Sequence, residues 1–394
     1  MTRAFLNAIG VVSALGDGAS DTYANMMAAT SPGMVRTDEY SPDAPCWVGR
    51  VRSDLSALPR ELRYLESRTN RLSLRALEQI EGPVRSALAR FGSARVGVVM
   101  GTSTSGIANA ERVVACHVAS AALPTDYDYR QQKLGSVGDF LAAHLECEGP
   151  SFTLSTACSS SAHALAAARD LIARGVCDAV VAGGADSLAR LTVRGFQALS
   201  AVSGGLANPL SRNRDGINIG EGAALFLVSR DEADLELVGA GASSDAHHVS
   251  APDPDGRGAV EAMQRALADA HLDANEIDYV NLHGTGTRLN DAIECLAVER
   301  VFGANVAVSS TKRLTGHTLG AAGAIELALC CLALAHRGDA NAGTPPHCWD
   351  GERDPALPCL PLARSPNARQ LRYCLSNSFA FGGNNAALVV GTTR

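Results

Sequence analysis

Short apolar runs rich in β-branched residues alternate with longer alanine-rich stretches along most of this chain of 394 residues. Short runs of this kind favour buried strands, and longer runs with helical periodicity favour helices. The alternation predicts an α/β protein whose strands are mainly parallel. The expected strands are 1–10, 96–100, 151–156, 178–182, 235–238, 279–282, 306–309, 373–375 and 386–390, and the expected helices are 158–174, 258–270 and 320–335.

The alternation begins twice. The opening Phe5-Leu6-Asn7-Ala8-Ile9-Gly10 is similar to Leu235-Glu236-Leu237-Val238-Gly239-Ala240, which follows a charged stretch at 230–232. The match hints at a duplicated unit, although one so short also arises by chance. We predict two halves, 1–233 and 234–394. The segment 337–367 is rich in Pro, Asp and Ala without periodicity, and we expect it to be an ordered surface excursion.

Composition excludes several classes of protein. The net charge is −7 and aromatic residues make up only 5%, so nucleic-acid binding is not expected. Eleven cysteines form no C-x-x-C pair, which indicates neither a metal site nor a disulfide framework. No uncharged apolar stretch reaches membrane length, and the first residues do not resemble a signal peptide. These features predict a cytoplasmic protein with no membrane insertion.

Around Cys158 an extended run, Leu154-Ser155-Thr156, turns into a helix-forming stretch of small residues. Backbone N–H groups at a helix start stabilise a thiolate, so this position suits a nucleophile. Cysteine is also among the most buried residue types and commonly acts as a small hydrophobe. Taken alone, the segment leaves both interpretations open.

Two loops further along the chain carry histidines. His283 ends an expected strand and opens His283-Gly284-Thr285-Gly286-Thr287, and Lys312 and His317 follow another expected strand. In α/β sheets, ligands bind beyond the carboxyl ends of the strands. Cys158, His283 and His317 are therefore candidates for one site.

Five separated motifs together resemble a β-ketoacyl-(acyl carrier protein) synthase of the elongating type, within the thiolase-fold superfamily, over nearly the whole chain. The motifs are Thr156-Ala157-Cys158-Ser159-Ser160; Arg214-Asp215-Gly216 with Gly220-Glu221-Gly222; His283-Gly284-Thr285-Gly286-Thr287 with Asn290-Asp291 and Glu294; Lys312 with Gly316-His317 and Gly320-Ala321-Ala322-Gly323; and Asn377-Ser378-Phe379 with Phe381-Gly382-Gly383. The resemblance implies a thiolase-like fold in which two similar α/β halves form α-β-α-β-α layers.

The same resemblance implies a reaction. Cys158 would take an acyl chain from a carrier thioester, and His283 and His317 would bind a malonyl thioester carbonyl and stabilise the enolate formed when CO₂ leaves. Lys312 would organise the site through its charge, and the backbone N–H groups of Cys158 and Phe381 would form the oxyanion hole. The reaction would be a decarboxylative Claisen condensation catalysed by an acyltransferase.

Further roles follow from the resemblance. Asp291 and Glu294, three residues apart at a helix start, would orient the His and Lys loops; without the motif they would be ordinary capping and surface carboxylates. The residues expected to contact substrate are Thr285 and Thr287 on the pantetheine arm, and Phe379 and Phe381 as a gate of the acyl tunnel. No cofactor or metal is expected, because the substrate brings its phosphopantetheine on an acyl carrier protein.

Some positions depart from the family pattern. Ser211 stands where an aspartate commonly precedes Arg-Asp-Gly, and Ala380 replaces a glycine whose positive-φ freedom alanine lacks. Thr104 lies where relatives carry a glycine or a larger aliphatic residue beside the acyl pocket, so we expect it to influence which chains are accepted, unsaturated ones included.

A basic helix face is a further candidate. Arg68, Arg71 and Arg75 recur at i, i+3 and i+7, and acyl carrier proteins are acidic, so this face either docks the carrier or is simply solvated. We expect a structural rather than a catalytic role for His163, within a helix, and for the pair His247-His248, in a turn.

Other classes remain for comparison. Thiolases and initiating synthases have active sites of the Cys-His-Cys or Cys-His-Asn type. The second histidine of this chain, His317, argues against both classes. A chain-length-determining partner of a ketosynthase heterodimer would resemble the synthases but lack the nucleophile, and Cys158 is present. A homodimer, or a heterodimer in which this chain is the active half, both remain open, as does the choice among fatty acid, polyketide and aryl polyene pathways.

Overall fold

The computed structural model describes residues 2–339, 342–364 and 370–393. Ten strands form two similar groups of five. The first group is β1 (Phe5–Ser13), β5 (Val96–Gly101), β6 (Ser151–Leu154), β7 (Ala179–Asp186) and β9 (Gly222–Ser229). The second is β10 (Leu235–Ser244), β11 (Tyr279–Asn281), β12 (Ala307–Ser309), β13 (Tyr373–Ala380) and β14 (Asn384–Thr392).

The two groups have the same topology. The strand order is β6-β5-β7-β9-β1 in the first and β12-β11-β13-β14-β10 in the second, so strands at equal places along each half occupy equal places in each group. The directions also match, because β5 runs parallel to β6 and β7 as β11 runs parallel to β12 and β13. A single residue pair, Phe5 with Glu236, joins β1 to β10 and makes one continuous sheet.

The expectation of mainly parallel strands is wrong for the inner strands. β9 runs antiparallel to both β7 and β1, and β14 runs antiparallel to both β13 and β10. Strand direction depends on the path of the connection, and hydrophobic periodicity contains no information about it. Parallel pairing is confined to β5, β6 and β7 in one half and to β11, β12 and β13 in the other, among these ten strands. The carboxyl ends of each set of three therefore point the same way.

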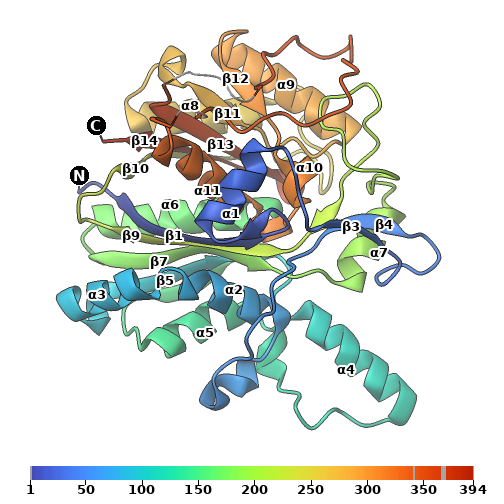
Figure 1. The fold of residues 1–394 in the computed structure, drawn as a ribbon, viewed down its shortest axis with the longest axis vertical. Coiled ribbons are helices and arrows are strands. Elements are labelled where there is room, and N and C mark those ends of the chain that lie inside the picture. The colour runs from blue at the N-terminus through green and yellow to red at the C-terminus, as the bar shows by residue number, and fades with distance from the viewer. Residues whose placement is uncertain (1, 340–341, 365–369, 394) are drawn as a thin grey trace.

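Helices cover the sheets in layers. α6 (Ser160–Ala173) and α11 (Ala322–Ala335) lie between the two groups of strands, while the outer faces carry other helices (Figure 1). Below the first group lie α2 (Arg68–Glu78), α3 (Glu81–Phe91) and α5 (Ser136–Leu145), and above the second lie α8 (Arg257–Ala270) and α9 (Arg288–Phe302). This is the expected five-layer arrangement.

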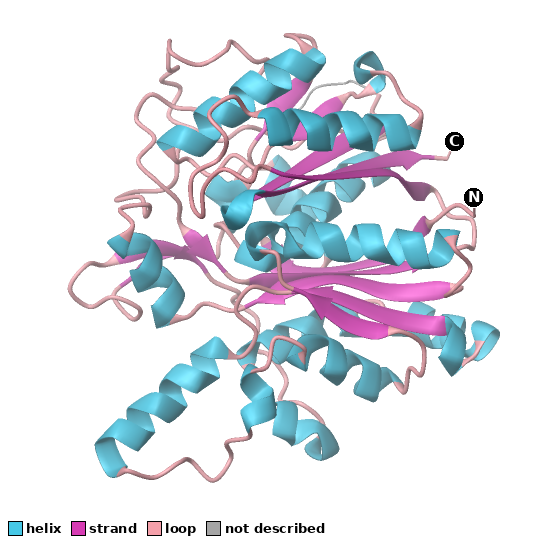
Figure 2. Ribbon diagram, turned by 180° about the vertical axis from the view of Figure 1, so that it is seen from behind, coloured by secondary structure: helices cyan, strands magenta, loops and turns pink. Residues whose placement is uncertain are grey.

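The remaining α-helices and strands lie outside these layers or at their edges. They are β2 (Gly16–Asp17), β3 (Met34–Thr37), β4 (Cys46–Gly49), β8 (Ile219–Gly220), α1 (Ala19–Met27), α4 (Ile107–Ser120), α7 (Arg190–Ala198) and α10 (Lys312–Thr315). α4 projects from the rest of the molecule (Figure 2). Within the described ranges, no helix combines the length and the apolar character needed to cross a membrane.

The central layer contains the largest hydrophobic cluster, drawn from α6, α11 and strands of both halves. Every residue of α11 from Ala322 to Leu334 is buried. Small residues allow this close packing: a side chain at Gly101 would lie 2.3 Å from the backbone nitrogen of Ser161. The start of α6 is therefore held directly against the strand ends.

The segment 337–367 is only partly the surface excursion that its composition predicts, and 340–341 and 365–367 lie outside the described residues. The stretch from Ala342 to His347 is buried. It packs against the end of β12 and the loop that follows, where Ser309 donates to the carbonyl of Pro345 and Ser310 donates to His347.

Candidate active site

Cys158 lies in a tight turn between β6 and α6. The chain passes from the strand through Ala157, which has a left-handed φ of 51°, into the 3₁₀ turn Ala157–Ser159. A non-glycine residue in this region is strained, by about 1 kcal/mol or more. The hydroxyls of Ser103 and Ser160 donate to the carbonyl of Ala157 and hold the turn. Cys158 is thereby held in a fixed turn at the start of α6.

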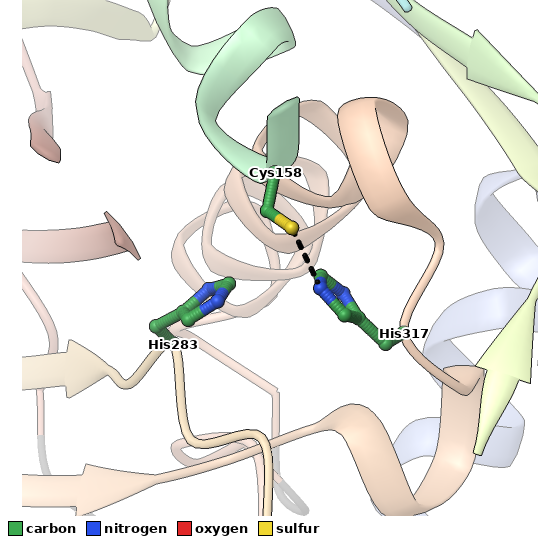
Figure 3. A group of neighbouring side chains, drawn as sticks. All are labelled: Cys158, His283 and His317. Atoms are coloured by element: carbon green, nitrogen blue, oxygen red, sulfur yellow. Dashed lines mark hydrogen bonds between the residues drawn. The ribbon is translucent and has the colours of Figure 1, made fainter. Parts of the chain in front are cut away.

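The structure brings Cys158, His283 and His317 together. The Cys158 Sγ lies 3.0 Å from Nε2 of His317, and one side-chain donor atom from each of the three residues lies within 4.8 Å of the others (Figure 3). The two imidazole rings are 5.2 Å apart, edge to face. Cys158 comes from the first half and both histidines from the second, so the site lies between the halves.

Burial controls the charge of these groups. Desolvation raises the pKa of Cys158 to about 12, against a smaller opposing effect of Lys312. It holds the pKa values of His283 and His317 well below their ordinary value, and the Lys312 charge acts in the same direction. The resting site therefore holds a neutral thiol beside two neutral imidazoles. Desolvation is the largest effect on the Cys158 pKa, and it opposes the thiolate that a helix start would favour.

Lys312 lies beneath His283 and has a partner that sequence reasoning missed. Its ammonium donates to the backbone carbonyl of His283 and to Glu326 of α11, and lies 3.3 Å from Nδ1 of His283. The Lys312 and Glu326 side chains are each 2% exposed. Burial raises the pKa of Glu326 to about 7, while Lys312 opposes that rise. The signal in the sequence was Glu326 itself, the one acidic residue in the otherwise apolar helix 322–335.

The two histidines differ in how their tautomers are set. The ammonium of Lys312 faces Nδ1 of His283, so that nitrogen accepts and the ring proton resides on Nε2. For His317, the described residues offer Nδ1 no hydrogen-bond partner, and Nε2 faces the Cys158 sulfur. His283 is therefore a fixed donor at Nε2, whereas His317 can either accept or donate there.

Glu294 and Asp291 both bind the loop that contains His283. Glu294 accepts from the backbone nitrogens of His283 and Gly284 at 2.7 Å, and Asp291 accepts from that of Gly286 at 3.1 Å. Both carboxylates are buried. Asn377 donates to Glu294 at 3.2 Å. The hydrogen bonds of both acids run to the His283 loop and to Leu210, Asn290 and Asn377, whereas Lys312 binds Glu326.

A cavity of about 460 Å³ opens onto the three reacting side chains. The predicted substrate residues Thr285, Thr287, Phe379 and Phe381 line it, as do Phe196 and Leu289. The Phe381 ring is 39% exposed and packs 5.7 Å from that of Phe196. The backbone nitrogen of Phe381 donates to the Cys158 sulfur and lowers the pKa of that thiol slightly. Its role in an oxyanion hole stays a prediction.

Thr104 is absent from the described lining of that cavity. It is buried, and its hydroxyl and backbone nitrogen both donate to Asp186 at the end of β7. Asp186 also accepts from Thr102, Ser103 and the backbone of Ala321. Sequence reasoning missed Asp186, which fixes the loop behind the nucleophile. The effect of Thr104 on chain selection stays a prediction.

The positions that depart from the family pattern have clear surroundings. The hydroxyl of Ser211 donates to Asp350, so a carboxylate is present there although it comes from a distant residue. Ala380 has φ −117°, which any residue adopts, so the expected loss of positive-φ freedom does not apply. Positive φ occurs instead at Gly382 and Gly383.

The three arginines of the basic helix face each have a carboxylate partner. Arg68 binds Glu221, which is fully buried, Arg71 binds Glu66, and Arg75 binds Asp17 and Glu78. Docking of a carrier at this face stays a prediction. His163 lies in α6 and is half-buried, and His247 and His248 lie in an exposed turn.

Zinc accepts thiolate and imidazole donors, which the Cys158, His283 and His317 cluster would offer. The Lys312 ammonium stands within hydrogen-bonding reach of the His283 ring, however, and its positive charge opposes a divalent cation there. The separation of 3.0 Å between the Cys158 sulfur and His317 is that of a hydrogen bond. The geometry fits a nucleophile and its base better than a metal centre.

Comparison with known proteins identifies two family matches. Residues 66–234 match "Beta-ketoacyl synthase, N-terminal domain", and residues 235–339 match "Beta-ketoacyl synthase, C-terminal domain". A 3-oxoacyl-[acyl-carrier-protein] synthase 2 of Coxiella burnetii is 30% identical over 98% of both chains. Nodulation protein E of Rhizobium meliloti is 38% identical over 256 residues, which span 62% of this chain and 62% of that protein, less than two thirds of its length.

Solved structures of related proteins match the fold of this chain. A ketosynthase (ApeO) in complex with its chain length factor (ApeC), from Xenorhabdus doucetiae, superimposes with a TM-score of 0.95 at 43% identity, covering 100% of this chain and 98% of that chain. A β-ketoacyl synthase from Burkholderia phymatum superimposes with a TM-score of 0.88 at 29% identity. Both share the fold described above over the full chain.

Proposed function

This chain belongs to the β-ketoacyl synthase family, and on that premise we propose that it is a 3-oxoacyl-(acyl carrier protein) synthase. It joins a malonyl unit to an acyl chain held on Cys158, with loss of CO₂. The observation that supports this most is the contact of the Cys158 sulfur with Nε2 of His317, with His283 beside them at the base of the cavity. The pathway, whether fatty acid, polyketide or aryl polyene, follows from the acyl chain accepted.

In the first step an acyl group moves from the carrier to Cys158. The thiol gives its proton to Nε2 of His317 as its sulfur attacks the thioester carbonyl, and the proton then passes to the departing carrier thiol. The carbonyl oxygen becomes negative in the tetrahedral intermediate, where the N–H groups of Cys158 and Phe381 bind it. This step requires His317 to begin with its ring proton on Nδ1 and none on Nε2. No described residue accepts a hydrogen bond from or donates one to Nδ1, so no contact excludes this tautomer.

In the second step the malonyl thioester loses CO₂, and the electron pair of the broken C–C bond forms an enolate. The Nε2–H of His283, fixed by Lys312, donates to the enolate oxygen, and His317 donates beside it once its ring proton has moved from Nδ1 to Nε2. The carbanion attacks the acyl group on Cys158, the new C–C bond forms as the C–S bond breaks, and the released Cys158 thiolate takes up one proton from solvent. Removing one such donor costs about 10²–10³ in rate.

A ketosynthase-like partner is the assembly that we propose, either a second copy or a chain-length partner. β6 ends the strand order and, within the described chain, pairs only with β5, so its outer edge is open. Phe152 on this strand is 38% exposed. Large apolar side chains are also exposed on and after α4: Val114, Val118, Leu123, Tyr129 and Leu134. The ApeO relative is described with a chain length factor, which supports a heterodimer.

The division into halves 1–233 and 234–394 remains our proposal, supported by the repeated strand order. A cytoplasmic setting is proposed as well. All eleven cysteines are free, as a reducing compartment would keep them. The acyl carrier protein is the proposed donor of both substrates.

Intact mass spectrometry after incubation with acyl-carrier thioesters of different lengths tests the function. We expect an acyl adduct on the wild-type protein and none on Cys158→Ala, followed by loss of the adduct when malonyl carrier is added. The same experiment with a co-expressed partner chain distinguishes a dependent subunit from an inactive one. A wild-type protein that takes up no acyl group under either condition contradicts the proposal.

A further inference from the structure

His347 lies outside the cavity and is not part of the reacting group, yet both of its ring nitrogens are engaged. Nδ1 accepts from the backbone nitrogen of Ser310 at 3.2 Å, and Nε2 lies 3.1 Å from the carbonyl of Pro209, to which it donates. The residue is 8% exposed, and Trp349 packs against its ring. The two bonds together define one neutral tautomer.

The first bond leads to the His283 loop in one step. The hydroxyl of Ser310 donates to the carbonyl of Gly284 at 2.6 Å. The same hydroxyl oxygen of Ser310 accepts from the backbone nitrogen of Lys312. The packing is close, because a side chain at Gly284 would lie 2.5 Å from Cβ of Ser310. A displacement of Ser310 therefore moves both the His283 loop and the start of α10.

The second bond leads to the same loop from the opposite side. The peptide group between Pro209 and Leu210 has its carbonyl bound by His347 and its N–H bound by Asp291 at 2.8 Å. Asp291 also holds the backbone nitrogen of Gly286. Leu210 has a left-handed φ of 64°, a strained conformation for leucine that these two bonds maintain.

We infer that His347 is a positioning residue that closes a ring of hydrogen bonds around the His283 loop. The ring runs from His347 through Ser310 to Gly284, and returns from Gly286 through Asp291 and the 209–210 peptide. Burial lowers the pKa of His347 to about 4, so the neutral form that accepts at one nitrogen and donates at the other persists at neutral pH.

The consequence for the reaction rests on the proposed function. His283 is needed as a donor during condensation, while acyl loading uses Cys158 and His317. The backbone of His317 is anchored separately, by a bond of 2.6 Å to the carbonyl of Asn218. Loss of His347 therefore weakens condensation more than loading.

Three substitutions separate the two bonds. His347→Leu removes both, His347→Asn keeps an acceptor near the position of Nδ1, and His347→Gln keeps a donor near that of Nε2. The matched control is His336→Leu, since His336 also bonds a backbone carbonyl, that of Leu332 at the end of α11, away from this ring. Each variant is first shown to be folded by its circular dichroism spectrum and thermal midpoint.

Hydrogen exchange of the full-length protein, followed by mass spectrometry, gives a readout independent of activity. We expect faster exchange in peptides covering 283–287 and 308–312 in His347→Leu, partial recovery in His347→Asn, and no change at these peptides in His336→Leu. Unchanged exchange in His347→Leu would overturn the inference, whether or not the enzyme is active.

Single-turnover kinetics give the second readout. In His347→Leu we expect condensation to fall about tenfold, while acyl loading on Cys158 changes by less than about twofold. Equal losses in the two steps would instead indicate a general structural role and would also overturn the inference. A wild-type protein that loads nothing would refute the proposed function, and the exchange experiment would still decide the role of His347.

Discussion

The proton of Cys158 offers the sharpest test of the site. Burial raises the pKa of this thiol to about 12, so only about 10⁻⁵ of the protein would hold a thiolate at pH 7. If that preformed thiolate were the attacking species, loading would accelerate tenfold per pH unit, or roughly 300-fold from about pH 6 to about pH 8.5. If His317 instead takes the proton during attack, the rate should be nearly flat.

The flat profile is our prediction, because the pKa of His317 lies well below its ordinary value and the ring stays neutral over that range. Rapid-quench mass spectrometry of a single acyl transfer to Cys158 measures the rate. His317→Gln removes the base and should slow loading by about 10²–10⁴. It should also restore the steep dependence on pH.

A tenfold rise per pH unit in the wild-type protein would refute this reasoning. So would a titration near the ordinary cysteine pKa, since it would show that the thiol is far less desolvated than the 7% exposure of Cys158 indicates. Substrate hydrolysis at the higher pH is subtracted with Cys158→Ala.

Three other expectations follow from buried or exposed groups. Glu326→Leu leaves the Lys312 ammonium buried without its anion and should lower the free energy of unfolding in urea by about 3–5 kcal/mol, and adding Lys312→Met should recover much of this. Burial raises the pKa of Glu294 to about 7, so the folded protein binds this proton more tightly than the unfolded chain, and the free energy of unfolding of the wild type falls by about 3 kcal/mol between about pH 4.5 and about pH 7. Glu294→Gln lacks this titration, so its free energy of unfolding should rise by about 3 kcal/mol relative to the wild type across that window. A difference that does not change with pH would contradict this. Phe152→Asp on the open edge of β6 should reduce the mass measured by light scattering to that of one chain, and an unchanged oligomer would place the interface elsewhere.

Much of the site could be predicted from local patterns. The motifs around Cys158, His283 and His317 each follow a strand, and the edge rule for α/β sheets is enough to expect them together. The helix after Cys158 and the apolar helix 322–335 also appear close to their expected bounds.

The missed residues share a physical reason. Glu326, Asp186 and His347 act through partners that are distant in sequence, and buried polar groups reveal such partners only when the chain is folded. The direction of β9 and β14 was missed because it depends on how the connecting segments return to the sheet. The burial of 342–347 was missed because its proline-rich composition is typical of exposed loops.

The repeated strand order gives the active site a pseudo-twofold frame. Cys158 follows β6 as Lys312 follows β12, and the loop that contains Thr104 follows β5 as His283 follows β11. Equivalent positions have thus acquired unlike duties: one half supplies the nucleophile and a rigid polar network around Asp186, and the other supplies the groups that manage charge and protons. A duplicated scaffold can keep its backbone symmetry while its chemistry becomes entirely asymmetric, because only the side chains at the strand ends need to diverge.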